Sequence, residues 1–394
     1  MEAEGGGEQG SVMELTFSPD FSGNNGKFKV VEVTPEILDE IRQGDGSVCI
    51  KGLPSEEAVL CTKTKTYSIR HLDSTNTMLL LPADSPVVSG SFNGHFELSP
   101  ILPKLHALSQ LLMQEASITQ EEVEETEEDA DGMELVVEAK GKKGYTWEQL
   151  QDRVQASDAE LEEALYNMGA IQWRGRRGEG EGRWRVLAQD YDDAITELLL
   201  TTVRSHDWPL SHVPLEECVA EGESIYPALF VEHCLKCLAL GGLKEAEKEK
   251  EKKKERTMLS LDPERICRFR ARQILSSTPN KPSWLYEEFL AKWTDTVRDD
   301  GVPLEAISVD SLKGLVLVTE IGAEKHASLF PVSSLPPHPK ERFAILFKKR
   351  PKWTVEDIAP YVSDLVSGDI TTEAFLSQYA RMSTQAGVVF YSQR

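Results

Sequence analysis

An acidic block about a third of the way along the chain restricts the folds open to it. Residues 121–138 contain ten acidic and no basic residues in eighteen positions. Like charges at this density repel one another and bring few apolar groups to bury, which predicts a disordered linker over residues 119–140. We therefore expect the parts on either side to fold separately, so that deleting the block leaves both intact.

The part before the block has the pattern of an all-β module. Short alternating or apolar runs are separated by Gly, Pro, Asn and Asp, namely KFKVVEV, SVCIKG, AVLCT, KTYSIRHLD, TMLLLP and GHFELSP. These runs predict roughly six strands in a barrel or small sandwich over residues 25–118, after a disordered N-terminus at 1–24. Because the run MLLLP is too apolar for a sheet with one solvated face, we expect a partner chain to cover part of the module.

The segment just after the block predicts two helices followed by a hairpin. Thr146 and Ser157 stand at N-cap positions before apolar repeats of helical period, and Gly169 suits the left-handed residue that ends the second helix. AIQW and RWRVL then read as two strands joined by a Gly-rich connection. This order is typical of a winged helix, whose second helix and wing can lie against DNA.

The end of the chain repeats this order. PKERFAILFKK predicts a first helix, and WTVEDIAPYVSDL predicts a second one with a kink or restart at Pro360. Thr371 or Thr372 is expected to cap a third helix whose inner face extends to Met382. Gly387 is expected to end that helix, and VVFYS to close the chain as a strand.

Between these two segments the pattern is less regular but has the same parts. Asp262 and Pro263 begin one predicted helix, a Trp-rich helix follows from Trp284 to about Val297, and LKGLVLVTE with ASLFPV predicts a hairpin. The charged run at 244–256 predicts a solvated helix or a mobile insertion. The predicted architecture is therefore α+β, a β-rich barrel-like module followed by three tandem winged helices at residues 141–192, 193–336 and 337–394.

Composition limits the cell compartment and the mode of nucleic-acid binding. Six cysteines without framework spacing in 394 residues fit a reducing compartment. No apolar run approaches the roughly 18 residues needed to span a bilayer, and MEAEGGGEQG lacks the features of a signal peptide, so no membrane partner is expected. With a formal net charge of -23, any attraction to nucleic acid must be local.

Motifs of catalysis or cofactor binding are not evident. The sequence has no Gly-rich phosphate loop, HExxH pair or GxSxG elbow. One metal-like pattern, formed by His233, Cys234 and Cys237, lacks a second ligand pair and is also typical of a buried helix. We therefore predict no catalytic, cofactor-binding or metal-binding residues and no enzyme activity. A thiol enzyme that uses Cys234 and Cys237 is the alternative, and burial of that helix would exclude it.

Clusters of basic residues stand out against the acidic background as candidate DNA contacts, since neutralising phosphates provides most non-specific affinity. They could instead offset neighbouring acids or contact an acidic protein. The predicted DNA-binding residues are Lys348, Lys349, Arg350, Lys352, Gln378, Arg381 and Arg394 in the last segment, and Arg174, Arg176, Arg177, Arg183 and Arg185 on the first predicted wing.

Several of these stretches together resemble a known family. AVLCTKTKTY, MLLLP, EHCLKC, LDPERICRFRARQIL, LKGLVLV, ERFAILF and WTVEDIAPYVSDL occur in the order found in the sister chromatid cohesion protein Dcc family. The resemblance runs from about Lys27 to Arg394. The charged run at 244–256 and the connection RGRRGEGEG look longer than the family pattern.

The resemblance implies a nuclear, non-catalytic accessory subunit of the alternative, cohesion-type replication factor C clamp loader. Its β-rich part would join the large subunit and a small third subunit, and its winged helices would reach single- and double-stranded DNA and DNA polymerase epsilon. The complex would act on the sliding clamp, so that this chain meets the clamp indirectly. The alternative is a winged-helix scaffold of another large complex that binds only protein.

Overall fold

The structure is a computed structural model that describes residues 14–21, 28–43, 48–54, 56–123, 143–174, 182–252, 257–277, 283–366, 370–385 and 387–394. Most of the predicted linker and of the predicted disordered N-terminus lies outside these ranges, as do Arg176 and Arg177. The chain divides into two compact units, residues 1–101 and 102–394. Among the described helices, none has the length and hydropathy needed to cross a bilayer.

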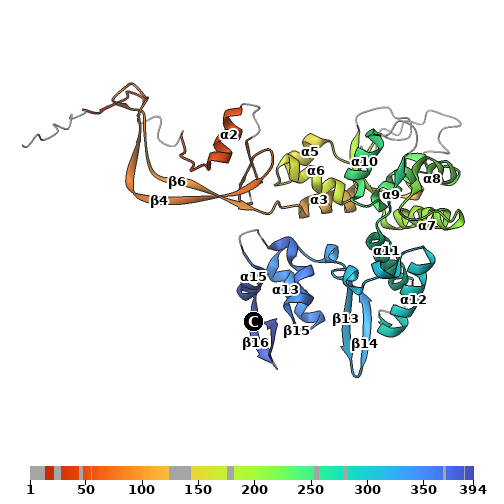
Figure 1. Cartoon of the computed structure of the whole chain (residues 1–394). Coiled ribbons are helices and arrows are strands. Elements are labelled where there is room, and N and C mark those ends of the chain that lie inside the picture. The colour runs from red at the N-terminus through yellow and green to blue at the C-terminus, as the bar shows by residue number, and fades with distance from the viewer. Residues whose placement is uncertain are drawn as a thin grey trace, which may run out of the picture. The chain divides into compact units, whose positions relative to one another are not determined.

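The first unit is built around an open four-stranded sheet in the order β2-β3-β4-β6. A long hairpin of β4 and β6 dominates it and curves along its length (Figure 1). β1 and β5 form a separate parallel pair. The elements of this unit are β1 (Thr16–Phe17), α2 (Pro35–Gln43), β2 (Cys49–Lys51), β3 (Val59–Cys61), β4 (Thr66–Leu80), β5 (Val87–Val88) and β6 (Gly90–Ile101).

The predicted barrel is wrong for the described strands, because none of the sheets closes on itself. We predicted separate strands for KTYSIRHLD and TMLLLP, but both belong to β4, with an irregularity of register between Asp73 and Met78. Residues 66–68 of this strand pair with β3 as well as with β6, while residues 69–73 and 78–80 pair with β6 alone. Strands of such unequal length leave no continuous edge that could close a barrel.

The second unit begins with a helical segment and a three-stranded sheet, β7-β9-β8. Thr146 and Ser157 form complete capping boxes, and Gly169 has a φ of 62°, so these predictions are confirmed. Residues 102–118, which we assigned to the β-rich module, pack into this unit through Leu108, Leu112 and Ile118. The elements are α3 (His106–Gln110), η1 (Leu111–Glu115), β7 (Ser117–Ile118), α5 (Trp147–Arg153), α6 (Asp158–Asn167), β8 (Ile171–Trp173) and β9 (Arg183–Leu187).

The start of the predicted linker is part of this fold. Glu122 accepts two hydrogen bonds of 2.8 Å from the guanidinium of Arg185, whose side chain is 3% exposed. Val123 is buried in the hydrophobic core of the helical body that follows. Residues 121–123 are therefore ordered, because one carboxylate of the acidic block has a buried cationic partner about sixty residues further along the chain.

Replacing Glu122 with Ala should lower the free energy of unfolding by about 2 kcal/mol, because it leaves a buried guanidinium without its carboxylate. Burial alone would raise the pKa of Glu122, but the hydrogen bonds and charges of Arg185 and Lys143 outweigh it and lower the pKa. Stability from this pair is therefore present above the unfolded pKa, near 4.5, and is lost as the pH falls through the lower folded value. Denaturant unfolding between pH 3 and 7 tests this.

The control for that experiment is Glu121→Ala, which removes an exposed neighbouring carboxylate. It should change the unfolding free energy by less than about 0.5 kcal/mol. Equal effects of the two substitutions would mean that the Arg185 pair does not stabilise the fold.

A helical body follows, with a shared hydrophobic core that includes Leu199, Phe230, Leu235, Phe289 and Trp293. The charged run forms a helix as far as Lys252, which confirms the prediction of a helix for that part. Asp262 caps α11 with Pro263 at its first turn, also as predicted. The helices are α7 (Gln189–Ser205), α8 (Leu215–Gly222), α9 (Ala228–Leu238), α10 (Gly242–Lys252), α11 (Pro263–Ser276) and α12 (Tyr286–Asp299).

Two small sheets accompany these helices. β10 (Val213–Pro214) pairs with β11 (Met258–Leu259), and a second sheet has the order β12-β14-β13. Trp284 lies in β12 and not in the predicted helix. The predicted hairpin is confirmed as β13 and β14, and the strands of this sheet are β12 (Trp284–Leu285), β13 (Val316–Ile321) and β14 (Glu324–Leu329). The short helices η3 (Leu304–Ala306), η4 (Val309–Leu312) and η5 (Val332–Ser334) lie in the connections.

Candidate nucleic-acid interface

The last segment carries most of the predicted DNA contacts on short helices and a three-stranded sheet with the order β15-β17-β16. Its elements are α13 (Pro339–Lys349), β15 (Lys352–Trp353), α14 (Val355–Ile358), η6 (Ala359–Tyr361), η7 (Ser363–Leu365), α15 (Thr372–Tyr379), β16 (Ala380–Gln385) and β17 (Val388–Gln393).

The predicted second helix is divided into a strand, a short helix and 3-10 turns, and is not a single kinked helix. Trp353 pairs with Tyr391 in the sheet, and Thr354 caps a helix of only four residues. A 3-10 turn containing Pro360 follows, because proline has no N–H to continue the helical hydrogen bonds. The predicted restart is therefore confirmed, but the helix is one turn long.

The predicted third helix is too long at its C-terminal end. Thr371 caps α15, as expected, but the helix stops at Tyr379. Met382 lies in β16 and is 60% exposed, so its assignment to the inner helix face is wrong. Gly387 lies in the turn between β16 and β17 with a φ of 82° and does not end a helix. β17 confirms the predicted closing strand.

An aromatic core holds these elements together. Trp353 is fully buried, and its indole N–H donates to the carbonyl of Leu346 at 3.2 Å. Phe343 stacks on Tyr379 with the ring centroids 5.4 Å apart. The buried guanidinium of Arg342 pairs with Asp364 and donates to two backbone carbonyls. These contacts fix the positions of α13 and β15, which carry Lys348, Lys349 and Lys352.

Lys348 and Lys349 occupy the last turn of α13 and are exposed. Positive charge is favourable there, because the unpaired carbonyls at a helix C-terminus carry partial negative charge. The ammonium of Lys349 lies 5.6 Å from the ring centroid of Phe330. Lys348 forms no ion pair with any residue in the described part of the chain.

The sheet brings two further cations together that are far apart in sequence. Lys352 on β15 and Arg381 on β16 are both directly opposite Ser392 on the central strand, so their side chains point to the same face. Two strand spacings separate them, roughly 10 Å. Both are exposed, and within the described ranges neither forms an ion pair. On the opposite face, Trp353 and Tyr391 pack into the core.

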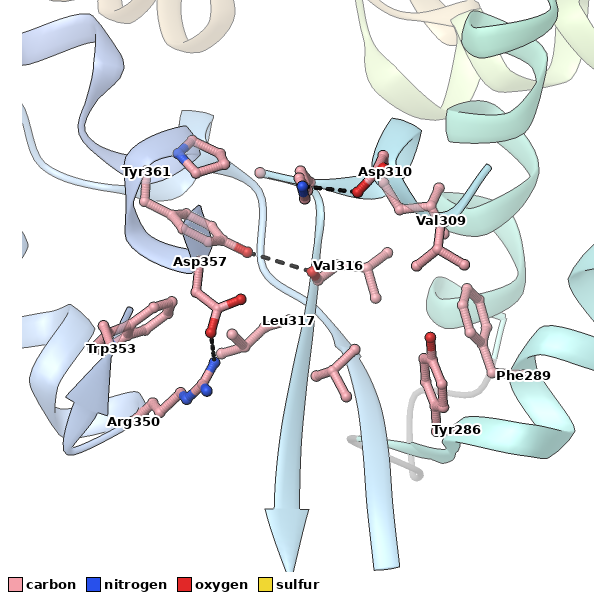
Figure 2. A pocket seen from close by; sticks show the side chains of 15 residues that line it. Tyr286, Phe289, Val309, Asp310, Val316, Leu317, Arg350, Trp353, Asp357 and Tyr361 are labelled. Atoms are coloured by element: carbon pink, nitrogen blue, oxygen red, sulfur yellow. Dashed lines mark hydrogen bonds and ion pairs between the residues drawn. The ribbon is translucent and has the colours of Figure 1, made fainter. Parts of the chain in front are cut away.

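Arg350 differs from its neighbours in the cluster. It forms an ion pair of 2.7 Å with Asp357 and lies over the ring of Trp353, as Figure 2 shows for the ion pair. Arg350 therefore holds the α14 turn against β15, and little of its charge remains for a phosphate. Gln378 is exposed on α15. Arg394 donates to the carbonyl of Ser377 at 2.7 Å and is otherwise exposed.

The predicted wing cations of the first segment differ in exposure. Arg185 is buried and donates to Glu122 and to the carbonyls of Ala116 and Ser117, so its prediction as a DNA contact is wrong. Arg183 is half-buried and donates to the carbonyl of Gly144. Arg174 is exposed. The sequence pattern of a basic hairpin does not reveal which cations turn inward.

The HCxxC pattern lies on α9 and packs inward. Cys234 is buried and donates to Asp192, while the sulfur of Cys237 lies 3.6 Å from Nε2 of His233. Burial raises the pKa of both thiols, that of Cys237 to about 12. A thiol with so high a pKa is a poor nucleophile near neutral pH. The helix therefore fits core packing better than a thiol enzyme.

Comparison with known proteins identifies the family of the chain. The family model for "Sister chromatid cohesion protein Dcc1" matches residues 28–362. The chain belongs to this Dcc1 family. The human sister chromatid cohesion protein DCC1 is 32% identical over 96% of this chain and 92% of its own length. The probable DCC1 of Dictyostelium discoideum is 30% identical, with 94% of each chain covered, and the Saccharomyces cerevisiae protein is 26% identical.

Proposed function

We propose that this Dcc1-family chain is a non-catalytic subunit that acts in sister chromatid cohesion and binds DNA through its last segment. Family membership supports the role in cohesion. The observation that carries the DNA-binding part is the alignment of Lys352 and Arg381 on one exposed face, beside the exposed Lys348 and Lys349. Fixed cations without carboxylate partners attract phosphates more strongly than paired ones.

We further propose that the three helix-and-sheet segments of the second unit are tandem winged helices. Each combines helices with a three-stranded sheet that ends in a hairpin, namely β8–β9, β13–β14 and β16–β17. In this fold the hairpin acts as a wing that contacts the nucleic-acid backbone. The outward row of Lys352 and Arg381 lies on the sheet that contains the last of these hairpins.

The partners proposed for this chain follow the family resemblance. They are the large and small accessory subunits of the alternative replication factor C clamp loader, DNA polymerase epsilon, and indirectly the sliding clamp, all in the nucleus. Hydrolysis of ATP would belong to other subunits. The non-catalytic role is supported by the raised thiol pKa values on α9.

The first unit supports a role in subunit assembly. Among its described residues, Ile37, Leu60 and Tyr67 form the buried core cluster, and Val59, Cys61 and Val88 are buried as well. Large apolar side chains remain exposed along the sheet and its connections, among them Phe17, Ile50, Leu53, Leu79 and Leu80. Exposed apolar strands of this kind mark sites that other chains cover.

A fragment of residues 1–101 is therefore expected to aggregate or unfold alone and to become soluble with its partner subunits. Too little apolar surface is buried to stabilise a domain of this size by itself. Co-expression with the candidate large and small subunits, followed by size-exclusion chromatography and hydrogen exchange, measures this. A monodisperse, exchange-protected fragment without partners would contradict the assembly role.

Titration of fluorescent single- and double-stranded oligonucleotides with the full chain tests DNA binding. We expect affinity to fall linearly with the logarithm of salt concentration, because bound phosphates release counterions. Absence of binding at low salt would favour the alternative, a winged-helix scaffold that contacts only protein.

A further inference from the structure

One edge of the β13–β14 hairpin pairs with no other strand in the described part of the chain. β13 is the last strand of its sheet. The N–H of Phe330 donates to the carbonyl of Leu315 at 2.8 Å. This bond shows which residues of β13 direct their backbone groups toward β14 and which direct them away from it. In the register of the pair, Leu317 and Thr319 then bond to β14, and the N–H and C=O groups of Val316, Val318 and Glu320 point outward.

Among the described residues, a hydrogen-bond partner is found only for the carbonyl of Val316. The hydroxyl of Tyr361 donates to the carbonyl of Val316 at 3.5 Å (Figure 2). Within the described part of the chain, no strand pairs with the outward side of Val318 or Glu320. Unpaired N–H and C=O groups on an edge strand are a template for another extended chain.

A small apolar cavity adjoins this edge. It has a volume of about 160 Å³ and is lined by Tyr286 and Phe289 of α12, by Trp353 and Tyr361 of the last segment, and by Val316 to Val318 (Figure 2). Small-molecule sites are larger, roughly 300–1,000 Å³. The volume suits one bulky apolar side chain. Val309 at the cavity is 44% exposed and adds apolar surface.

The charges around the cavity are paired. Lys313 contacts Asp310 at 2.7 Å, and Arg350 contacts Asp357 at 2.7 Å. These two cations are already neutralised, which disfavours a phosphodiester at this place. An uncharged, apolar segment is the occupant that this charge balance fits.

We propose that the β13 edge and the cavity together dock an extended segment of a partner protein. The segment adds a strand to the sheet through the backbone of Val318 and Glu320 and inserts one bulky aliphatic or aromatic side chain into the cavity. Backbone hydrogen bonds would provide affinity, and the cavity would select the residue. Lys348, Lys352 and Arg381 do not line the cavity, whereas Arg350, which pairs with Asp357, does.

Two pairs of variants of the full chain test the site. Val318→Pro removes the outward N–H without breaking a ladder bond, whereas Val318→Thr keeps that N–H and a similar shape. Val309→Asp places a charge at the cavity, whereas Val388→Asp changes a valine of equal exposure, 45%, on another hairpin. The probe is a random dodecapeptide phage library, from which enriched sequences are synthesised and titrated against each variant.

We expect enriched peptides to share one bulky apolar position in a β-prone sequence. Val318→Pro and Val309→Asp should each weaken binding about tenfold or more, because one loses a backbone bond and the other desolvates a charge. Val318→Thr and Val388→Asp should bind nearly as the unchanged protein does. In that unchanged protein, the amides of Val318 and Glu320 should exchange fast when free and slowly with peptide.

The opposite results would overturn the proposal. They are an absence of enriched peptides, full binding by Val318→Pro, no added protection at Val318 and Glu320, or displacement of the peptide by an oligonucleotide. Self-association that Val318→Pro abolishes would assign the edge to a second copy of the chain and overturn the partner proposal.

Discussion

Replacing Trp353 with Ala is expected to unfold the last segment of the chain. The indole is fully buried, contacts Tyr361 edge-to-face and donates to the carbonyl of Leu346. Truncating a buried Trp costs about 3–5 kcal/mol, a large part of the stability of a small domain. Because β15 consists only of Lys352 and Trp353, the strand that carries one of the proposed DNA-binding cations should also be lost.

Hydrogen exchange of the full chain measures this effect segment by segment. Amides of α13, α15 and β17 should lose protection in the Trp353→Ala protein, while those of α7 and α9 keep it. Met382→Ala is the matched control, since Met382 lies opposite Tyr391 in the same sheet but is 60% exposed. That control should cost less than about 0.5 kcal/mol. Retained protection of α13 in the Trp353→Ala protein would show that this core does not depend on the indole.

Local signals in the sequence predict those parts of the fold that depend on neighbouring residues. The capping boxes at Thr146 and Ser157, the Pro263 start of α11 and the β13–β14 hairpin are all readable within a few positions of the chain. Their energetics are local, because caps satisfy backbone groups of the same turn. Such elements therefore lie where the pattern predicts them.

The errors have a different physical origin. The sequence predicts separate strands before and after residues 74–77, but both belong to β4, because the residues on either side of this stretch pair with β6. Arg185 looks like a wing cation, but it turns inward to Glu122, which precedes it by 63 positions. In both cases the structure depends on contacts between residues that are far apart in the sequence. The residues near each position do not reveal such contacts.

The candidate DNA site was predictable only where its residues are neighbours in the sequence. The cluster Lys348 to Lys352 is visible as a run of basic residues, and the structure leaves Lys348, Lys349 and Lys352 exposed. The alignment of Arg381 with Lys352 was not visible, because it depends on the register of both strands with Ser392. The burial of Arg185 and the alignment of Arg381 with Lys352 both depend on how the strands pair. The order of residue types along the chain does not predict that pairing.

Reversing the charge of Lys348, Lys349 and Lys352 to Glu should greatly weaken DNA binding and leave the fold intact. All three side chains are exposed, so the substitutions remove no buried contact. Each phosphate contact contributes about 0.9 to the slope of log affinity against log salt, so three lost contacts flatten it by up to about 2.7. At 0.1 M salt this corresponds to a loss of roughly 10²-fold or more, similar for all DNA sequences. Binding is measured by fluorescence anisotropy at several salt concentrations.

The control must change the net charge equally, because the chain already carries a formal charge of -23 and repels DNA as a whole. Reversal of Lys244, Lys292 and Arg298, which are exposed outside the last segment and outside the proposed wings, makes the same change. If the lysine cluster is a DNA site, this control should bind DNA far better than the cluster variant at matched salt. Equal losses in the two proteins would mean that net charge alone sets the affinity. Unchanged binding of the cluster variant would remove these lysines as a DNA site, and a scaffold that contacts only protein would then explain the exposed helices and hairpins better.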